Sequence, residues 1–294
     1  MLRIFHLLIF FFLLSAISLH AAMTITYRAP ESDQDRRYDY DTSVLRLSLE
    51  KTRSQYGDYK MVPSKIMNYS RTHVVLKHNL HENFFAKLSY EDRLVQQEEL
   101  AFVPFPIDLG IVGYRVFFIS SKISRRLTGI KTVKALRELS IGQGNGWADI
   151  PILKAAGFNV IEVPSYESLF KMVAVNRFDL LSRGANELMD EYEAHKMIPG
   201  FTYDKTLCLA YPFPRFFFTD KSNTKAATRI AEGLLIAWAD GPLRTLWENH
   251  YRKSIEFVNF QKRTLLRIPN PYISTLDFDF SQYFIDPFSL SQTR

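Results

Sequence analysis

Cysteine is almost absent from this chain, which has Cys208 alone among its 294 residues. One thiol cannot form a disulfide within the chain, so the fold must be stable through its hydrophobic core. Cys208 stands in the apolar run 207–211, where we expect a small buried hydrophobe rather than a reactive nucleophile. A chain of this length can bury such a core, as one large domain or two smaller ones.

Motifs for catalysis, metal binding and nucleic-acid recognition are also lacking. The sequence has no Gly-x-Ser-x-Gly elbow, no His-Glu-x-x-His pair and no phosphate-binding P-loop. His73, His78 and His81 lie close together, but without the spacing of a zinc site. The formal net charge is +6 without an arginine-rich arm. We therefore expect no enzyme, no metal, no cofactor and no nucleic-acid partner.

The first residues have the composition of an export signal. Arg3 is followed by the apolar run 7–14 and by the small residues at 21–22. This order is that of a secretory signal peptide. A membrane anchor needs about 20 apolar residues, and polar side chains interrupt this run early. We expect residues 1–22 to be removed on export, and a single cysteine suits a periplasmic location better than an extracellular one.

Residues 139–187 alternate between strand and helix patterns. Strands are expected at 139–141, 158–163 and 178–181. Helices are expected after Asp149, which can cap one, and after Ser165. A repeat of strand, loop and helix predicts a parallel α/β sheet. Ligands in such sheets lie beyond the carboxyl ends of the strands, so the glycine-rich loop 142–146 and the turn 182–187 are candidate functional loops.

Two proline-marked segments bracket this α/β region. Residues 103–106 precede a long apolar segment, and residues 212–214 precede an apolar strand. Prolines at the start of an apolar strand suit a crossover between two lobes. The expected division is 23–108 with 212–294 for a discontinuous first lobe, and 109–211, including the hinge strands, for the second lobe.

Short motifs occur in a fixed order along nearly the whole chain. They lie at 56–59, 106–115, 146–149, 165–170, 176–179 with 183–187, and 231–234 with 240–241. Their order and spacing resemble the type II periplasmic solute-binding proteins, in particular the family 3 (amino-acid type) extracellular solute-binding group. The resemblance implies an α/β, two-lobed clamshell with two crossover strands that closes on a small solute.

The resemblance also implies a function and partners. A monomeric protein would capture a small polar solute, amino-acid-like or anionic, and present it to the permease of an ABC importer or to a sensor kinase. Family members usually hold the ligand carboxylate with an arginine in lobe one and the amine with an aspartate late in lobe two. At these places the chain offers Arg93 and either Arg183 or Glu187. A dehydratase-like enzyme on this fold and a scaffold without ligand are the alternatives.

Arg183 is the residue that we single out in the expected cleft. It follows a buried strand, and a guanidinium there can bind a carboxylate through two hydrogen bonds. The alternative is an ion pair with Glu187 or Asp190. We expect Arg115 to form an ion pair on the hinge strand. The complete set of expected ligand-binding residues is Arg183, Trp147, Tyr166, Arg93, Tyr40 and Glu187.

Overall fold

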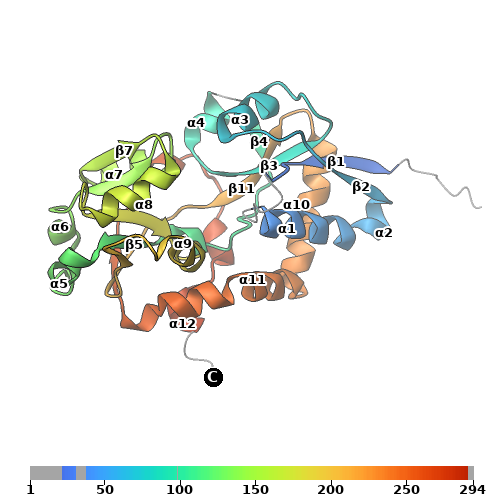
Figure 1. The fold of residues 1–294 in the computed structure, drawn as a ribbon. Helices are drawn as coiled ribbons and strands as arrows, with labels where there is room; N and C mark the ends of the chain where they lie inside the picture. Colours follow the sequence, from blue (N-terminus) through green and yellow to red (C-terminus); the bar gives the residue numbers. More distant parts are fainter. Residues whose placement is uncertain (1–21, 31–37, 98, 291–294) are drawn as a thin grey trace, which may run out of the picture.

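The computed structural model describes residues 22–30, 38–97 and 99–290, which form two lobes (Figure 1). The expected signal peptide, apart from Ala22, lies outside the described residues. Within the described part, no helix has the length and apolar character needed to span a membrane. The predicted two-lobed α/β architecture is confirmed.

The first lobe is built on a five-stranded sheet in the order β2-β1-β3-β11-β4. Its strands are β1 (Met23–Tyr27), β2 (Tyr59–Pro63), β3 (Phe84–Ser89), β4 (Leu100–Phe102) and β11 (Arg215–Asp220). β1 pairs in parallel with β2 and β3, whereas β11 is antiparallel to β3 and β4. Because β11 follows the second crossover, the first lobe is discontinuous in sequence.

Helices cover both faces of this sheet. They are α1 (Asp39–Lys51), α2 (Arg53–Tyr56), α3 (Tyr69–Lys77), α4 (Asp92–Gln96) and α10 (Thr224–Ala239). Successive side chains of a strand point to opposite faces. Accordingly, Phe85 and Phe217 belong to the large core cluster that includes α1, while Phe84, Phe216 and Phe218 belong to a separate cluster beneath α3.

The second lobe has a seven-stranded sheet in the order β12-β10-β5-β8-β6-β7, with β9 paired to β5. Its strands are β5 (Tyr114–Ser120), β6 (Ile141–Gly144), β7 (Val160–Val163), β8 (Leu180–Gly184), β9 (Phe201–Tyr203), β10 (Leu207–Ala210) and β12 (Thr264–Arg267). Its helices are α5 (Ser124–Leu127), α6 (Val133–Leu136), α7 (Asp149–Ala155), α8 (Tyr166–Ala174) and α9 (Leu188–His195). β6 is parallel to β7 and β8, as the pattern of residues 139–187 predicted.

One expected boundary differs from the structure. β12 pairs in parallel with β10 of the second lobe, although residues 212–294 were expected to lie wholly in the first. α11 (Pro242–Val258) leads the chain there, because it packs on α1 and α10 of lobe one and on α9 of lobe two (Figure 1). β12 then satisfies the backbone hydrogen bonds on the outer side of β10, which would otherwise be a sheet edge.

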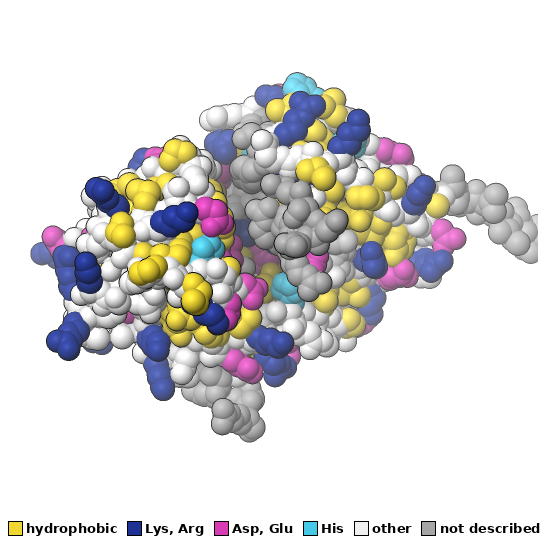
Figure 2. All heavy atoms as spheres, in the orientation of Figure 1, with side chains coloured by type: hydrophobic (Ala, Val, Ile, Leu, Met, Phe, Trp, Pro, Cys, Tyr) yellow, Lys and Arg dark blue, Asp and Glu magenta, His cyan; other side chains and the backbone are white. Residues whose placement is uncertain are grey.

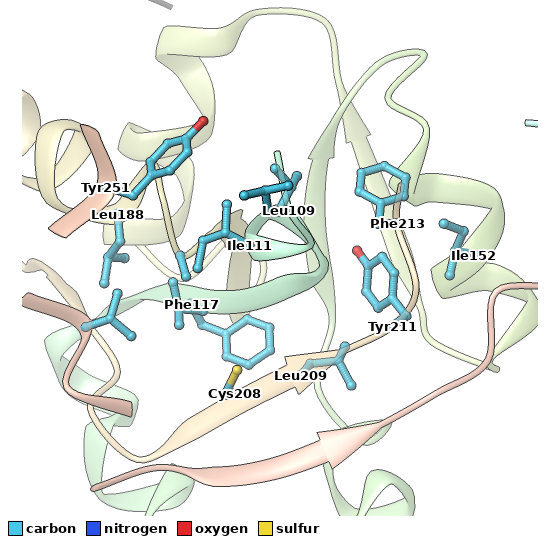
Figure 3. Packing of buried hydrophobic residues seen from close by; sticks show 14 of the residues in the cluster. Leu109, Ile111, Phe117, Ile152, Leu188, Cys208, Leu209, Tyr211, Phe213 and Tyr251 are labelled. Atoms are coloured by element: carbon cyan, nitrogen blue, oxygen red, sulfur yellow. The ribbon is translucent and has the colours of Figure 1, made fainter. Parts of the chain in front are cut away.

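The two crossover segments, 103–113 and 211–214, lie together at the junction of the lobes. The first ends in the 3₁₀ helix η1 (Ile111–Gly113), so the expected long strand begins only at Tyr114. Figure 3 shows apolar side chains of both segments in one buried region, Leu109 and Ile111 from the first and Tyr211 and Phe213 from the second. Cys208 is buried there too, as expected, and burial raises the pKa of its thiol to about 12.

The C-terminal residues 268–290 form an extended arm along this junction. It contains the 3₁₀ helices η4 (Pro271–Ile273) and η5 (Phe280–Tyr283) and the short helix α12 (Pro287–Leu290). The side chain of Asn270 donates a hydrogen bond to the carbonyl of Pro212, and the amide of Ile285 donates one to the carbonyl of Leu109. The arm therefore contacts both crossovers.

A tight approach between α1 and α10 gives the first prediction. A Cβ atom at Gly233 would lie 2.0 Å from the carbonyl oxygen of Ser48, so Gly233→Ala must separate the two helices. We expect a loss of about 1–3 kcal/mol in the free energy of unfolding, measured by urea denaturation. Gly129→Ala is the matched control, because an added Cβ there meets no atom within 4 Å. Equal stability of both variants would contradict this packing.

Candidate functional site

The surface is hollowed between the two lobes, and charged side chains lie along the lobe-two edge of this groove (Figure 2). Ion pairs at this junction involve the cations Lys87, Arg115, Arg183 and Arg215 and the carboxylates Asp41, Asp108, Asp149, Glu187 and Glu191. Buried charges are costly unless they are paired and hydrogen-bonded. Their concentration where the lobes meet therefore marks this region as the candidate site.

At the hinge, Arg115 and Asp149 form a buried ion pair. Arg115 lies on β5 and is 1% exposed, and its Nη2 is 2.9 Å from Oδ1 of Asp149. Its Nη1 donates to the carbonyl of Val112 at 3.0 Å, and the hydroxyl of Tyr211 donates to Asp149. The expected hinge ion pair of Arg115 is confirmed. Asp149 is not the helix cap, because α7 has Ala148 at its N-cap and uses Asp149 in this pair instead.

Arg183 lies near the end of β8 and forms ion pairs within lobe two. Its Nε donates to both carboxylate oxygens of Glu191, at 2.9 and 2.8 Å, and its Nη2 lies 2.5 Å from Glu191 and 3.0 Å from Glu187. Its guanidinium carbon stands 4.5 Å from the ring centroid of Trp147 and 5.9 Å from that of Tyr166. The ion pair with Glu187 is thus present, and the second partner is Glu191 rather than Asp190.

The carboxylates of this cluster have different electrostatic surroundings. Burial raises the pKa of Glu187, but the charges of Arg183, Arg115 and Arg215 outweigh it and lower that pKa to about 2. Its Oε2 also accepts a hydrogen bond from the amide of Gly184 at 2.9 Å. For Glu191, burial dominates and raises the pKa despite the contact with Arg183. Of these two carboxylates, Glu187 is therefore the one that is favoured in its ionised form.

The facing wall belongs to lobe one. Lys87 on β3 forms ion pairs with Asp41 and, at 3.2 Å, with Asp108. Arg215, the first residue of β11, donates to the hydroxyl of Ser89 at 3.2 Å and lies 3.9 Å from Asp108. Burial lowers the pKa of Arg215, but the carboxylates around it raise it overall, and Glu187 is among them. Charges of opposite sign therefore face each other across the junction.

The predicted ligand-binding residues divide into two groups. Arg183, Trp147, Tyr166 and Glu187 come together on lobe two. Arg93 lies on α4 of lobe one, where its Nε is 3.0 Å from a carboxylate oxygen of Glu91.

Tyr40, the sixth residue expected to bind the ligand, lies in the core of lobe one instead. It is 2% exposed, and its hydroxyl donates to the carbonyl of Ile107 at 2.7 Å. The reason is that α1 begins at Asp39, which places Tyr40 and Val44 one turn apart on the buried face.

Sequence reasoning missed the charged residues of lobe one and Glu191. Lys87 had a visible signal, because it is the only charged residue in the six-residue strand β3, which reads FFAKLS. A lysine within such an apolar strand needs a buried carboxylate as partner, and Asp41 and Asp108 provide it. Among the described residues, no group of three or more His, Cys, Asp or Glu side chains is arranged to hold a metal ion.

The lowered pKa of Glu187 predicts a dependence of stability on pH. An ionised Glu187 stabilises the folded state above the ordinary glutamate pKa of 4.5, and this contribution is lost as the pH falls toward about 2. Wild type should exceed Glu187→Gln by at most roughly 3 kcal/mol at pH 7, and the difference should shrink below pH ~4.5. Urea denaturation at several pH values measures it. Glu193→Gln, on the exposed side of α9, is the control, and a pH-independent difference would contradict the assignment.

Comparisons with known proteins identify the fold. No family model matches the sequence, and no curated protein is similar to it at a significant level. Among solved structures, YckB of Bacillus subtilis is 16% identical with a TM-score of 0.55, covering 84% of this chain and 97% of its own. A periplasmic binding protein of Salmonella typhimurium with high arginine specificity is 13% identical with a TM-score of 0.55, over 78% of this chain and 100% of its own.

A histidine kinase sensor domain that resembles periplasmic binding proteins is also similar. It is 12% identical with a TM-score of 0.55, covering 78% of this chain and 96% of its own. Two of these similar structures are thus described as a periplasmic binding protein and as a sensor domain rather than as enzymes. The chain has the two-lobed fold of the amino-acid-binding periplasmic proteins, as its sequence motifs predicted.

Proposed function

We propose that this protein is a periplasmic solute-binding protein that captures a small polar, amino-acid-like solute between its lobes by hinge closure. The observation that carries the proposal is the set of buried and partly buried charges of both signs where the lobes meet. Arg215 of lobe one stands opposite Glu187 and Asp149 of lobe two. A solute with both an ammonium and a carboxylate group requires partners of both signs.

The chemistry of the walls suits such a solute. Binding sites for small molecules combine apolar or aromatic surface with a few placed polar groups. Trp147 and Tyr166 supply aromatic surface next to Glu187, and Tyr166 is 41% exposed. Buried ion pairs by themselves add little stability to an interface, so recognition of a charged solute is the better explanation for retaining them.

We assign the lobe-two wall to Trp147, Tyr166, Arg183 and Glu187. On lobe one we propose Arg215 as the cation that receives the solute carboxylate. Arg93, expected for that role, is instead ion-paired with Glu91 at the start of α4. Among the described residues, the polar partners of Arg215 are the hydroxyl of Ser89 and, at 3.9 Å, the carboxylate of Asp108, so its guanidinium retains capacity for a further anion.

A membrane partner completes this function. Closure of the lobes on a solute converts binding into a change of shape that another protein can recognise. The similar structures include a substrate-binding domain of GlnP from Lactococcus lactis and a histidine kinase sensor domain. We propose the permease of an ABC importer or a sensor kinase as partner, and export of the chain through its N-terminal signal peptide.

A ligand screen tests the proposed function. The mature protein is heated with single amino acids, organic acids and polyamines, and a specific solute should raise Tm in a saturable way. Stabilisation of about 2.7 kcal/mol is expected when the solute is at 100 times its Kd. Calorimetry then measures Kd for each hit. The absence of a saturable shift with every class would reject solute binding.

Arg215 provides the mutational prediction for this site. Arg215→Met should weaken binding of the identified solute by about 10- to 100-fold, because a hydrogen bond to a charged group contributes about 1.5–3 kcal/mol. Calorimetry on folded protein measures the change. Arg244→Met is the matched control, since Arg244 pairs with Glu248 on the exposed side of α11. Unchanged affinity in Arg215→Met would show that another group holds the carboxylate.

A further inference from the structure

The surroundings of Arg183 have the form of a binding site for a free guanidinium group. Three segments of lobe two supply its walls: Trp147 from the loop before α7, Tyr166 from the start of α8, and Glu187 with Glu191 from the N-cap and body of α9. We call these four residues the guanidinium box. The guanidinium enters it from a fourth segment, β8.

The contacts in the box all involve the guanidinium itself. Nε and Nη2 make the ion pairs with Glu191 and Glu187 at 2.5–3.0 Å, and the ring of Trp147 lies 4.5 Å from the guanidinium carbon. Carboxylates that accept paired N–H groups, together with an aromatic face, are the general means by which proteins hold guanidinium compounds. None of these contacts requires that the guanidinium be attached to the chain.

The internal bonds of the box show that its walls are organised by more than Arg183. The hydroxyl of Tyr166 donates to Glu191 at 2.7 Å, and the backbone amide of Gly184 donates to Glu187 at 2.9 Å. Trp147 is packed against Gly144, where an added Cβ would lie 2.4 Å from the indole. These partners would keep the two carboxylates and the aromatic faces in place if the Arg183 side chain were shortened.

We propose that Arg183 is an internal ligand, whose guanidinium fills the guanidinium box and thereby excludes basic solutes from the lobe-two wall. The proposal rests on the proposed function, because exclusion of basic solutes matters only if the groove binds a solute. It makes Arg183 a specificity-determining residue of the groove. The ammonium of a zwitterionic solute can still reach Glu187, whose side chain is 26% exposed, whereas a guanidinium group would find the space between the two carboxylates and Trp147 already filled.

The alternative is that Arg183 is an ordinary structural ion pair. Both explanations predict that Arg183→Ala lowers Tm, because the variant leaves two partly buried carboxylates without their cation. They differ in what a small guanidinium compound then does. A preformed box should bind it, whereas a structural contact that collapses on truncation should not.

Chemical rescue with methylguanidine separates the two explanations. We expect methylguanidine to raise the Tm of Arg183→Ala in a saturable way and to bind this variant at least tenfold more tightly than wild type, whose box is filled. Urea, a neutral compound of similar shape, and sodium chloride at equal ionic strength are the controls. Equal effects of methylguanidine on variant and wild type, or equal rescue by urea, would overturn the proposal.

Two further variants test the box itself. Arg183→Ala with Glu191→Gln should lose the rescue, because the carboxylate that makes most of the contacts is gone. Arg229→Ala is the matched control: Arg229 is buried and lies 5.4 and 5.7 Å from two tyrosine rings, but its hydrogen bonds go to the hydroxyl of Thr52 and to backbone carbonyls. We expect it to be destabilised and to bind methylguanidine at least tenfold more weakly than Arg183→Ala.

The test remains decisive if Arg183→Ala fails to fold alone. The refolding yield from urea is then measured with and without methylguanidine, and recovery only in its presence supports the box, whereas no recovery overturns it. The readout is independent of the natural solute. If the solute screen fails but methylguanidine rescues Arg183→Ala, the proposed function is rejected and the guanidinium box is supported. If a solute binds but the rescue fails, only the guanidinium box is rejected.

Discussion

The buried ion pair between Arg115 and Asp149 is the contact on which the geometry of the groove depends. It joins the hinge strand β5 to the first turn of α7, and Tyr211 of the second crossover bonds to the same carboxylate. The register of β5 against β8 places Arg115 beside Gly184 and Val116 beside Arg183. The hinge strand thus determines where the lobe-two wall stands. A charge buried this deeply requires an ion-pair partner, so the hinge and the wall are constrained together.

The charges on the two walls are also interdependent. Glu187 is surrounded by Arg183 and Arg115 of its own lobe and by Arg215 of the other, and Arg215 in turn lies near Asp108. Attraction between Arg215 and Glu187 therefore favours approach of the lobes before any solute enters. Under the proposed function, a zwitterionic solute would replace this attraction by one contact with each wall. Such a solute shifts the balance between the open and closed conformations only if it binds them with different affinities.

Local patterns predicted the fold well, and non-local pairing explains what they missed. Apolar periodicity and the proline-marked segments identified both lobes, because each signal lies within a few residues. The place of β12 depends on an open edge of β10 more than fifty residues earlier, which no local pattern encodes. In the site, Glu191 rather than Asp190 contacts Arg183, because Glu187 and Glu191 are four residues apart and share one helix face, whereas Asp190 is turned away by about 100°.

The C-terminal arm bears on how far the hinge can move. Its Phe284 packs so closely on Gly110 of the first crossover that an added Cβ would lie 2.6 Å from the ring. Asp92 of lobe one accepts four hydrogen bonds, from the amides and hydroxyls of Ser274 and Thr275, so the arm is held firmly beside the crossovers. If the lobes rotate about the crossovers, the arm must therefore move with them or these hydrogen bonds must break. A hinge restrained in this way narrows the range of open conformations, and a narrower range lowers the entropic cost of closing on a solute.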